Sequence, residues 1–125
     1  MKTAKDPRHQ RRQEMVKAIF AESFTPQHNP DTQVKKILEN LDSIDDKIRV
    51  IAPEFPIDKI NKVDLAILRL GVYELSIDKS QPEKVVIDES IELAKEFGND
   101  TSAAFINGAL GKLVKTATDD KSTTI

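Results

Sequence analysis

The sequence contains no cysteine and no tryptophan, and five phenylalanines and one tyrosine are its only aromatic residues. Without cysteine the chain has neither a disulfide framework nor a thiolate metal site. No apolar run approaches the ~20 residues that a helix needs to span a bilayer. The N-terminal stretch MKTAKDPRHQRRQ is polar and lacks the apolar segment of a signal peptide. These absences predict a cytoplasmic protein.

Groupings of residues that carry catalysis are also missing. The only histidines, His9 and His28, lie in polar segments. Tyr73 and Glu74 resemble an acid–base pair, but neighbouring positions on a helix point about 100° apart and do not converge on one atom. Three acidic residues on one segment resemble metal ligands but have no histidine beside them, so we interpret them as structural; they are Asp88, Glu89 and Glu92. We therefore expect a protein that is not an enzyme and holds no metal or cofactor.

Charge is distributed unevenly along the chain. Residues 1–17 contain six basic and two acidic residues, whereas the whole chain has a net charge of −2. The basic N-terminus therefore precedes an acidic body. This pattern is typical of a polyanion site confined to one edge, although a solvated N-terminal turn would show it too.

Helical periodicity recurs in every segment of the chain and strand-like alternation is scarce. At 125 residues the chain has room for one domain. The pattern predicts an all-α fold, a compact bundle of about six helices. We expect a flexible basic N-terminus over residues 1–7, a helical domain over 8–117 and a disordered polar tail over 118–125.

In the first half, the spacing predicts three helices. The first covers residues 8–23, the second is short and begins with Asp31 or Thr32 as its N-cap, and the third ends before Pro53. The spacing of Ser43 and Asp46 resembles a capping box at the start of the third helix. In the connector that follows, we expect the side chains of Phe55 and Ile57 to plug the core.

In the second half, the pattern predicts a central, largely apolar helix that begins at Asn61. Gly71 within it implies close approach of a neighbouring helix, because an interior glycine costs ~1 kcal/mol relative to alanine. The next helix is expected to run from Pro82 to Gly98. Asp100 or Thr101 is predicted to cap the last helix, in which Gly108 should again allow tight packing.

Three linked motifs fall between Val63 and Lys112: VDLAILRLGVYEL, PEKVVIDESIELAKEFG and FINGALGK. In this order they resemble the NusB family of transcription antitermination factors, and RRQEMVKAIF resembles the opening helix of that family. The resemblance covers residues 8–24 and 55–114. Departures from the family pattern occur at Phe55, Asp88, Ser90 and Gly111, and the stretch from Thr25 to Pro53 is shorter than usual.

The resemblance implies a NusB-like fold and a role without covalent chemistry. NusB-like proteins bind the ribosomal protein NusE. The pair recognises a short single-stranded boxA RNA element in ribosomal RNA transcripts and joins the transcription elongation complex. A homodimer is also compatible with the resemblance.

Candidate RNA-binding residues lie in two places. The basic group comprises Lys5, Arg8, Arg11 and Arg12, which would contact phosphates and supply affinity rather than sequence information. Arg12 matches the family's arginine best, and its alternative role is an ion pair with an acidic residue on the last helices.

The resemblance also places the last helix near the RNA, with candidates Thr101, Ser102, Phe105 and Asn107. Phe105 is the best candidate for stacking on a base, since it sits at the edge of the apolar stripe. The alternatives are a core position for Phe105, a cap at Thr101 or Ser102, and a buried hydrogen bond at Asn107.

Asp64 occupies the acidic position at the start of the central helix, which in the family lies near the NusE surface. Its alternative role is to cap that helix. Two other functions remain open for the whole chain: an accessory RNA-binding module of an RNA cytosine methyltransferase, and a bundle that binds only proteins.

Overall fold

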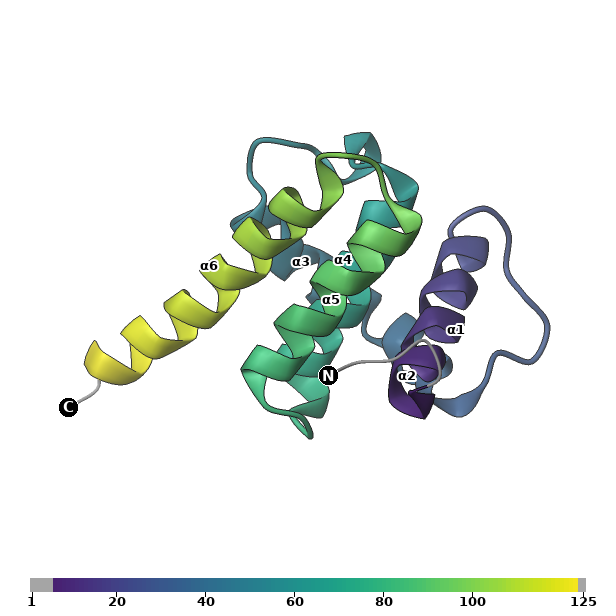
Figure 1. Cartoon of the computed structure of the whole chain (residues 1–125), viewed down its shortest axis with the longest axis horizontal. Helices are drawn as coiled ribbons and strands as arrows, with labels where there is room; N and C mark the ends of the chain where they lie inside the picture. The colour runs from purple at the N-terminus through teal and green to yellow at the C-terminus, as the bar shows by residue number, and fades with distance from the viewer. Residues whose placement is uncertain (1–5, 124–125) are drawn as a thin grey trace.

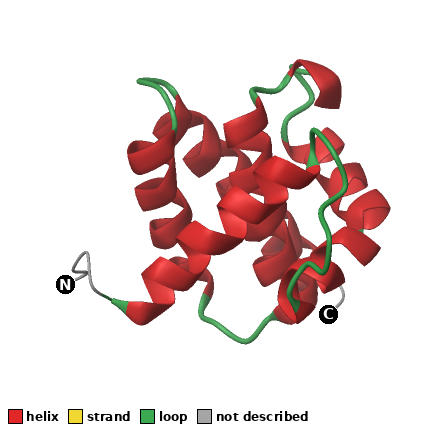
Figure 2. Ribbon diagram, turned by 90° about the vertical axis from the view of Figure 1, so that its right-hand side faces the viewer, coloured by secondary structure: helices red, strands yellow, loops and turns green. Residues whose placement is uncertain are grey.

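The computed structural model describes the backbone of residues 6–123 and the side chains of residues 6–115. Within that range the chain is helical and contains no strand (Figure 2). The elements are α1 (Pro7–Glu22), α2 (Thr32–Glu39), α3 (Leu41–Ile51), η1 (Ile57–Lys59), α4 (Lys62–Tyr73), η2 (Glu74–Asp78), α5 (Glu83–Phe97) and α6 (Ser102–Thr123). The prediction of an all-α bundle is confirmed.

Side-chain caps set the starts of three helices. The Asp6 carboxylate accepts a hydrogen bond from the backbone N–H of Arg8 at the start of α1. Asp31 and Asn61 do the same for α2 and α4, each accepting from two backbone N–H groups, as the sequence predicted. The prediction of a capping box at Ser43 is wrong, because α3 begins at Leu41 and Ser43 already lies inside the helix.

Helix α4 is the centre of the bundle. It packs against α1, α3, α5 and α6, so it has almost no face left for solvent (Figure 1). Ile67, Leu68 and Leu70 are at most 1% exposed. The largely apolar circumference of this segment therefore has a simple cause, and its predicted central position is confirmed.

At Gly71, side chains of α5 and α6 lie close to the backbone of α4. A Cβ atom at this position would lie 2.9 Å from Cδ1 of Leu110 and 3.2 Å from Oγ of Ser90. The predicted close approach is therefore present. The same prediction for Gly108 is wrong, since that residue is exposed and a Cβ there would meet nothing within 4 Å.

The C-terminal helix is longer than composition suggested. The described backbone of α6 is helical to Thr123, well into the segment 118–125 that was expected to be disordered. Its last turns extend beyond the other helices (Figure 1). None of the helices within the described residues has the length and apolar character of a membrane span.

Candidate nucleic-acid interface

The first turns of α1 present two of the predicted basic residues at the surface. The Arg8 side chain is 78% exposed and lies 3.7 Å from the Asp6 carboxylate. Arg11 is 38% exposed and donates to Asp31 Oδ1 at 2.7 Å. Both line one hollow of about 260 Å³ at this end of the bundle. Lys5 lies outside the described residues.

Arg12 has the interior role instead. It is 7% exposed, and its guanidinium donates to both carboxylate oxygens of Glu74, at 2.9 and 2.7 Å. A third hydrogen bond reaches Glu89 at 3.3 Å. Of the two roles predicted for Arg12, the structure shows the ion pair. A phosphate contact is disfavoured because the guanidinium is buried and already paired with two carboxylates.

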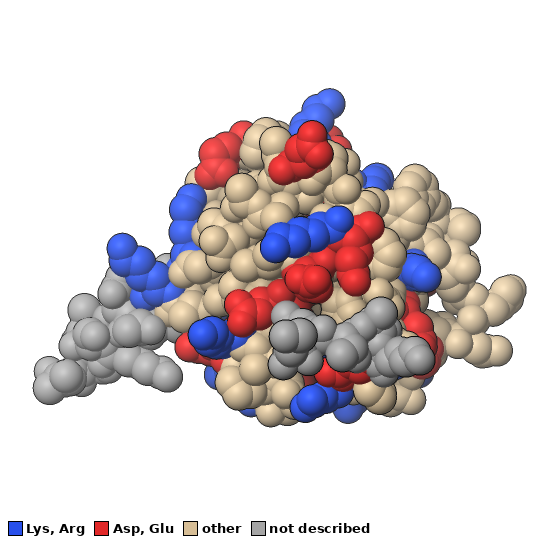
Figure 3. Space-filling model, viewed as in Figure 1, with Lys and Arg blue, Asp and Glu red and all other residues tan. Residues whose placement is uncertain are grey.

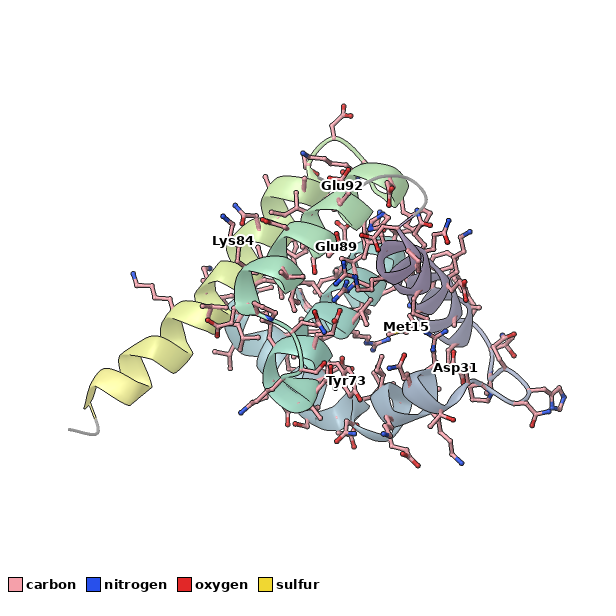
Figure 4. All side chains as sticks on the ribbon, turned by 60° about the horizontal axis from the view of Figure 1, so that its bottom comes forward. Met15, Asp31, Tyr73, Lys84, Glu89 and Glu92 are labelled. Atoms are coloured by element: carbon pink, nitrogen blue, oxygen red, sulfur yellow. The ribbon has the colours of Figure 1, made fainter. Side chains whose placement is uncertain are left out.

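His9 is a member of the same buried cluster, which the sequence analysis missed. Its side chain is 3% exposed, with Nδ1 3.0 Å from Glu89 and Nε2 2.7 Å from Glu96. Carboxylate acceptors at both ring nitrogens require a proton on each, which is the imidazolium form. Glu89 of α5 therefore contacts two side chains of α1, those of His9 and Arg12 (Figure 4). The i, i+3 spacing of His9 and Arg12 was the only sequence signal for this pairing.

The cluster makes stability depend on pH. Burial lowers the pKa of His9, but hydrogen bonds and attraction from Glu89 and Glu96 outweigh it, so the pKa is raised above the ordinary value of 6.5. A raised pKa in the folded state contributes stability that is fully present below pH 6.5 and is lost as pH rises through the folded-state pKa.

We expect His9→Gln to destabilise the protein most below pH 6.5. The difference in melting temperature between the variant and the wild type should shrink as the pH rises from 6.5 through the folded-state pKa of His9. Thermal unfolding of both proteins across the pH range measures it, with His28→Gln, an exposed histidine, as the control. A pH-independent difference would mean that His9 is neutral in the folded protein.

At the start of α6 the four predicted residues divide by exposure. Thr101 and Asn107 are exposed, so the buried hydrogen bond considered for Asn107 is absent. Ser102 is 0% exposed and its Oγ accepts from the backbone N–H of Asn99, which makes it part of the turn rather than a surface contact. Asn99, not Asp100 or Thr101, supplies the side-chain acceptor there, taking hydrogen bonds from Thr101.

Phe105 lies at the rim of the core and faces a second phenylalanine. Its ring is 5.8 Å from that of Phe55, centroid to centroid, in an edge-to-face arrangement. Phe55 is 47% exposed, so the expectation that it plugs the core is wrong. It stands in a turn between Pro53 and Pro56, where the connector passes over the surface. Ile57, by contrast, packs against the core.

A pocket of about 330 Å³ opens beside these two rings. Its wall comprises Phe55, Lys59, Ile60, Asn61, Asp64, Asn99, Thr101 and Phe105. The structure therefore brings Asp64 together with two of the predicted RNA-binding residues, Thr101 and Phe105, but not with Ser102 or Asn107. We call this site the Phe55–Phe105 pocket.

The basic residues of α1 lie far from this pocket. The hollow at Arg8 and Arg11 is lined by Tyr73 and Glu74, where α4 ends and η2 begins. The Phe55–Phe105 pocket is lined by Asn61 and Asp64, at the cap and first turn of α4. A twelve-residue helix is about 18 Å long. In Figure 1, α1 begins at the bottom of the view and α6 begins at the top. The candidate residues thus form two separate sites.

Acidic side chains cover part of the surface. Figure 3 shows them over the middle of the face turned to the viewer, where α5 lies, with a basic side chain among them and others at the edges. The acidic residues of this helix are Glu83, Asp88, Glu89, Glu92 and Glu96. Glu89 is buried, but the other four add negative charge to this side of the bundle, and such a surface repels polyanions.

Comparisons with known proteins agree with the fold. The model of the NusB family matches residues 4–115. The Transcription antitermination protein NusB of Clostridium botulinum (strain Kyoto / Type A2) is 47% identical over 81 residues, 65% of this chain. That match spans only 57% of the relative's length. The protein of the same name from Lachnoclostridium phytofermentans is 41% identical over 95 residues, covering 74% of this chain and 72% of the relative. A solved structure of T. maritima NusB is 33% identical with a TM-score of 0.75, and the match covers 92% of this chain and 93% of that one.

Proposed function

The chain belongs to the NusB family, and on that premise we propose that it is a transcription antitermination factor that binds single-stranded boxA-type RNA together with the ribosomal protein NusE. The pair would join the transcription elongation complex on ribosomal RNA operons and promote processive elongation. The protein itself would carry out no covalent chemistry.

The observation that carries the RNA-binding part of this proposal is the Phe55–Phe105 pocket. Recognition of single-stranded RNA relies on aromatic faces against which unpaired bases stack. Here two rings meet outside the sealed core, beside the exposed hydroxyl of Thr101 and the ammonium of Lys59. A flat base against the rings and a phosphate near Lys59 would match the two kinds of group.

Contact with NusE is proposed at the first turn of α4, as the resemblance implied for Asp64. Asp64 itself is only 6% exposed. Its neighbours Asn61 and Lys62 are exposed and would supply most of the contact area.

Binding to boxA-like and scrambled single-stranded RNA, with and without NusE, tests the function as a whole. We expect preference for the boxA-like RNA when NusE is present. Equal binding of both RNAs in its presence would refute antitermination and favour a general accessory RNA module, such as one that serves an RNA cytosine methyltransferase. Binding of NusE alone, with no RNA bound, would favour a bundle that binds only proteins.

Salt dependence tests the basic end of α1. With Arg12 buried, Arg8 and Arg11 are its described candidates for phosphate contact. The double variant Arg8→Ala/Arg11→Ala should weaken RNA binding and flatten the slope of log K against log salt by about 1.4, at ~0.7 per phosphate contact. RNA titrations over a range of salt concentrations measure this slope.

Arg49→Ala is the matched control for that experiment. Arg49 is also exposed and paired with a nearby carboxylate, but it lies on α3. Its replacement should leave the slope unchanged. If the α1 double variant behaves like the Arg49 variant, the α1 basic residues do not contact RNA.

A further inference from the structure

Asp64 carries an oxygen atom whose hydrogen-bonding capacity is unused. Among the described residues no group donates to its Oδ1, although that atom is buried and the residue is 6% exposed. A buried carboxylate oxygen without a donor costs free energy in the unbound protein. Asp64 also forms part of the wall of the Phe55–Phe105 pocket. The missing donor is therefore best sought in a ligand of that pocket.

Capping does not explain the Asp64 carboxylate. Asn61 Oδ1 accepts hydrogen bonds from the backbone N–H groups of Val63 and Asp64, at 2.8 and 3.4 Å. The first turn of α4 thus has a cap without the aspartate. The Asp64 carboxylate is therefore not needed for the cap, and its oxygens remain acceptors of hydrogen bonds.

Other polar groups of the pocket complement this acceptor. Thr101 Oγ1 donates to Asn99 Oδ1 at 2.9 Å, which leaves its lone pairs to accept from a ligand. The Lys59 ammonium adds positive charge to the wall. That charge opposes entry of an arginine or lysine from a partner protein, and it attracts a phosphate. Two aromatic rings complete a site for a flat, uncharged group attached to an anion.

We propose that the Phe55–Phe105 pocket binds one unstacked nucleobase whose Watson–Crick edge donates to the Asp64 carboxylate. Guanine fits this description best, because its N1–H and 2-amino groups lie side by side and match the two oxygens of a carboxylate. The base packs against Phe55 and Phe105, and its phosphate lies toward Lys59. This inference rests on the proposed RNA binding and specifies which chemical group the pocket selects.

The test uses short oligouridines that carry one central guanosine or one central inosine, which lacks only the 2-amino group. The wild-type protein should bind the guanosine form about tenfold more tightly, as for other paired hydrogen bonds to a base edge. Asp64→Asn should bind both forms equally, because an amide replaces one acceptor oxygen by a donor. Its melting temperature should equal or exceed that of the wild type, since an unsatisfied charge has been removed.

Asp58→Asn is the matched control, because it makes the same change of charge at an exposed residue of η1 that is not part of the pocket wall. It should keep the preference for guanosine. Phe55→Ala provides a second variant whose fold is safe, since that ring is half exposed. It should weaken both oligonucleotides together, because stacking does not depend on the 2-amino group.

Three results would overturn the inference, and they have different meanings. Tight wild-type binding without preference for guanosine leaves RNA binding intact and removes the base assignment. Loss of NusE binding in Asp64→Asn, with the guanosine preference retained, assigns the carboxylate to the protein partner. If the wild type binds neither oligonucleotide nor a boxA-like RNA, the proposed function fails with it.

Discussion

Arg12→Ala is expected to lower the free energy of unfolding by about 3–5 kcal/mol, the usual cost of removing one partner from a buried ion pair. In the wild type Glu74 and Glu89 are 8% and 4% exposed, and the substitution removes the cation that they share. Denaturant unfolding of the two proteins measures the loss. The loss in free energy of unfolding should exceed any change in the free energy of RNA binding by the folded variant.

Arg49→Ala serves as the control here too, because its ion pair with Asp46 is exposed. Surface pairs of this kind contribute about 0–1 kcal/mol. If Arg12→Ala cost no more than that control, water would have access to the cluster. Arg12 would then return to the set of candidate phosphate contacts.

Leu68→Ala is expected to cost about 2–5 kcal/mol, because it removes three carbons from a fully buried position and leaves a cavity. Leu68 is 0% exposed on α4, the helix against which most of the others pack. The midpoint of denaturant unfolding should fall without a change in slope. Lys62→Ala, an exposed position on the same helix, should change stability by less than about 0.5 kcal/mol. A near-zero effect at Leu68 would mean that the helix faces are assigned wrongly.

The buried cluster of His9, Arg12, Glu74 and Glu89, with the exposed Glu96 at its edge, also bears on function. It joins α1 to η2 and α5 through hydrogen bonds on both sides of Glu89. The exposed Arg8 and Arg11 lie on the same first turns of α1. The position of Arg8 and Arg11 relative to the rest of the bundle therefore depends on the cluster. A substitution at His9 that weakens the cluster should also loosen the attachment of this basic surface to the bundle.

Local patterns predicted most of the helical framework. The caps at Asp31 and Asn61, the central position of α4 and the close approach at Gly71 each depend on residues near one another in sequence or on a conspicuous apolar run. The failures have the opposite character. Gly108 was assigned by analogy with Gly71, but nothing packs on its side of α6.

Charged and aromatic residues were harder to place for the same reason. Arg12 and Arg8 look alike in the sequence, and only contact with Glu74, 62 residues away, makes one of them interior. Phe55 and Phe105 also lie far apart along the chain, and their pairing at a surface pocket required the turn at Pro53 and the start of α6 to meet. Hydrophobic pattern does not report such encounters.

By itself, the sequence determined the helices, their order and the family, because capping, apolar periodicity and linked motifs are encoded in short stretches of chain. The tertiary structure alone decided which polar groups are buried and which lie together. It put Arg12 and His9 inside, and it brought Asp64 to the same pocket as Phe105. The physical reason is that exposure and electrostatic environment depend on the elements packed around a residue, and these come from distant parts of the chain.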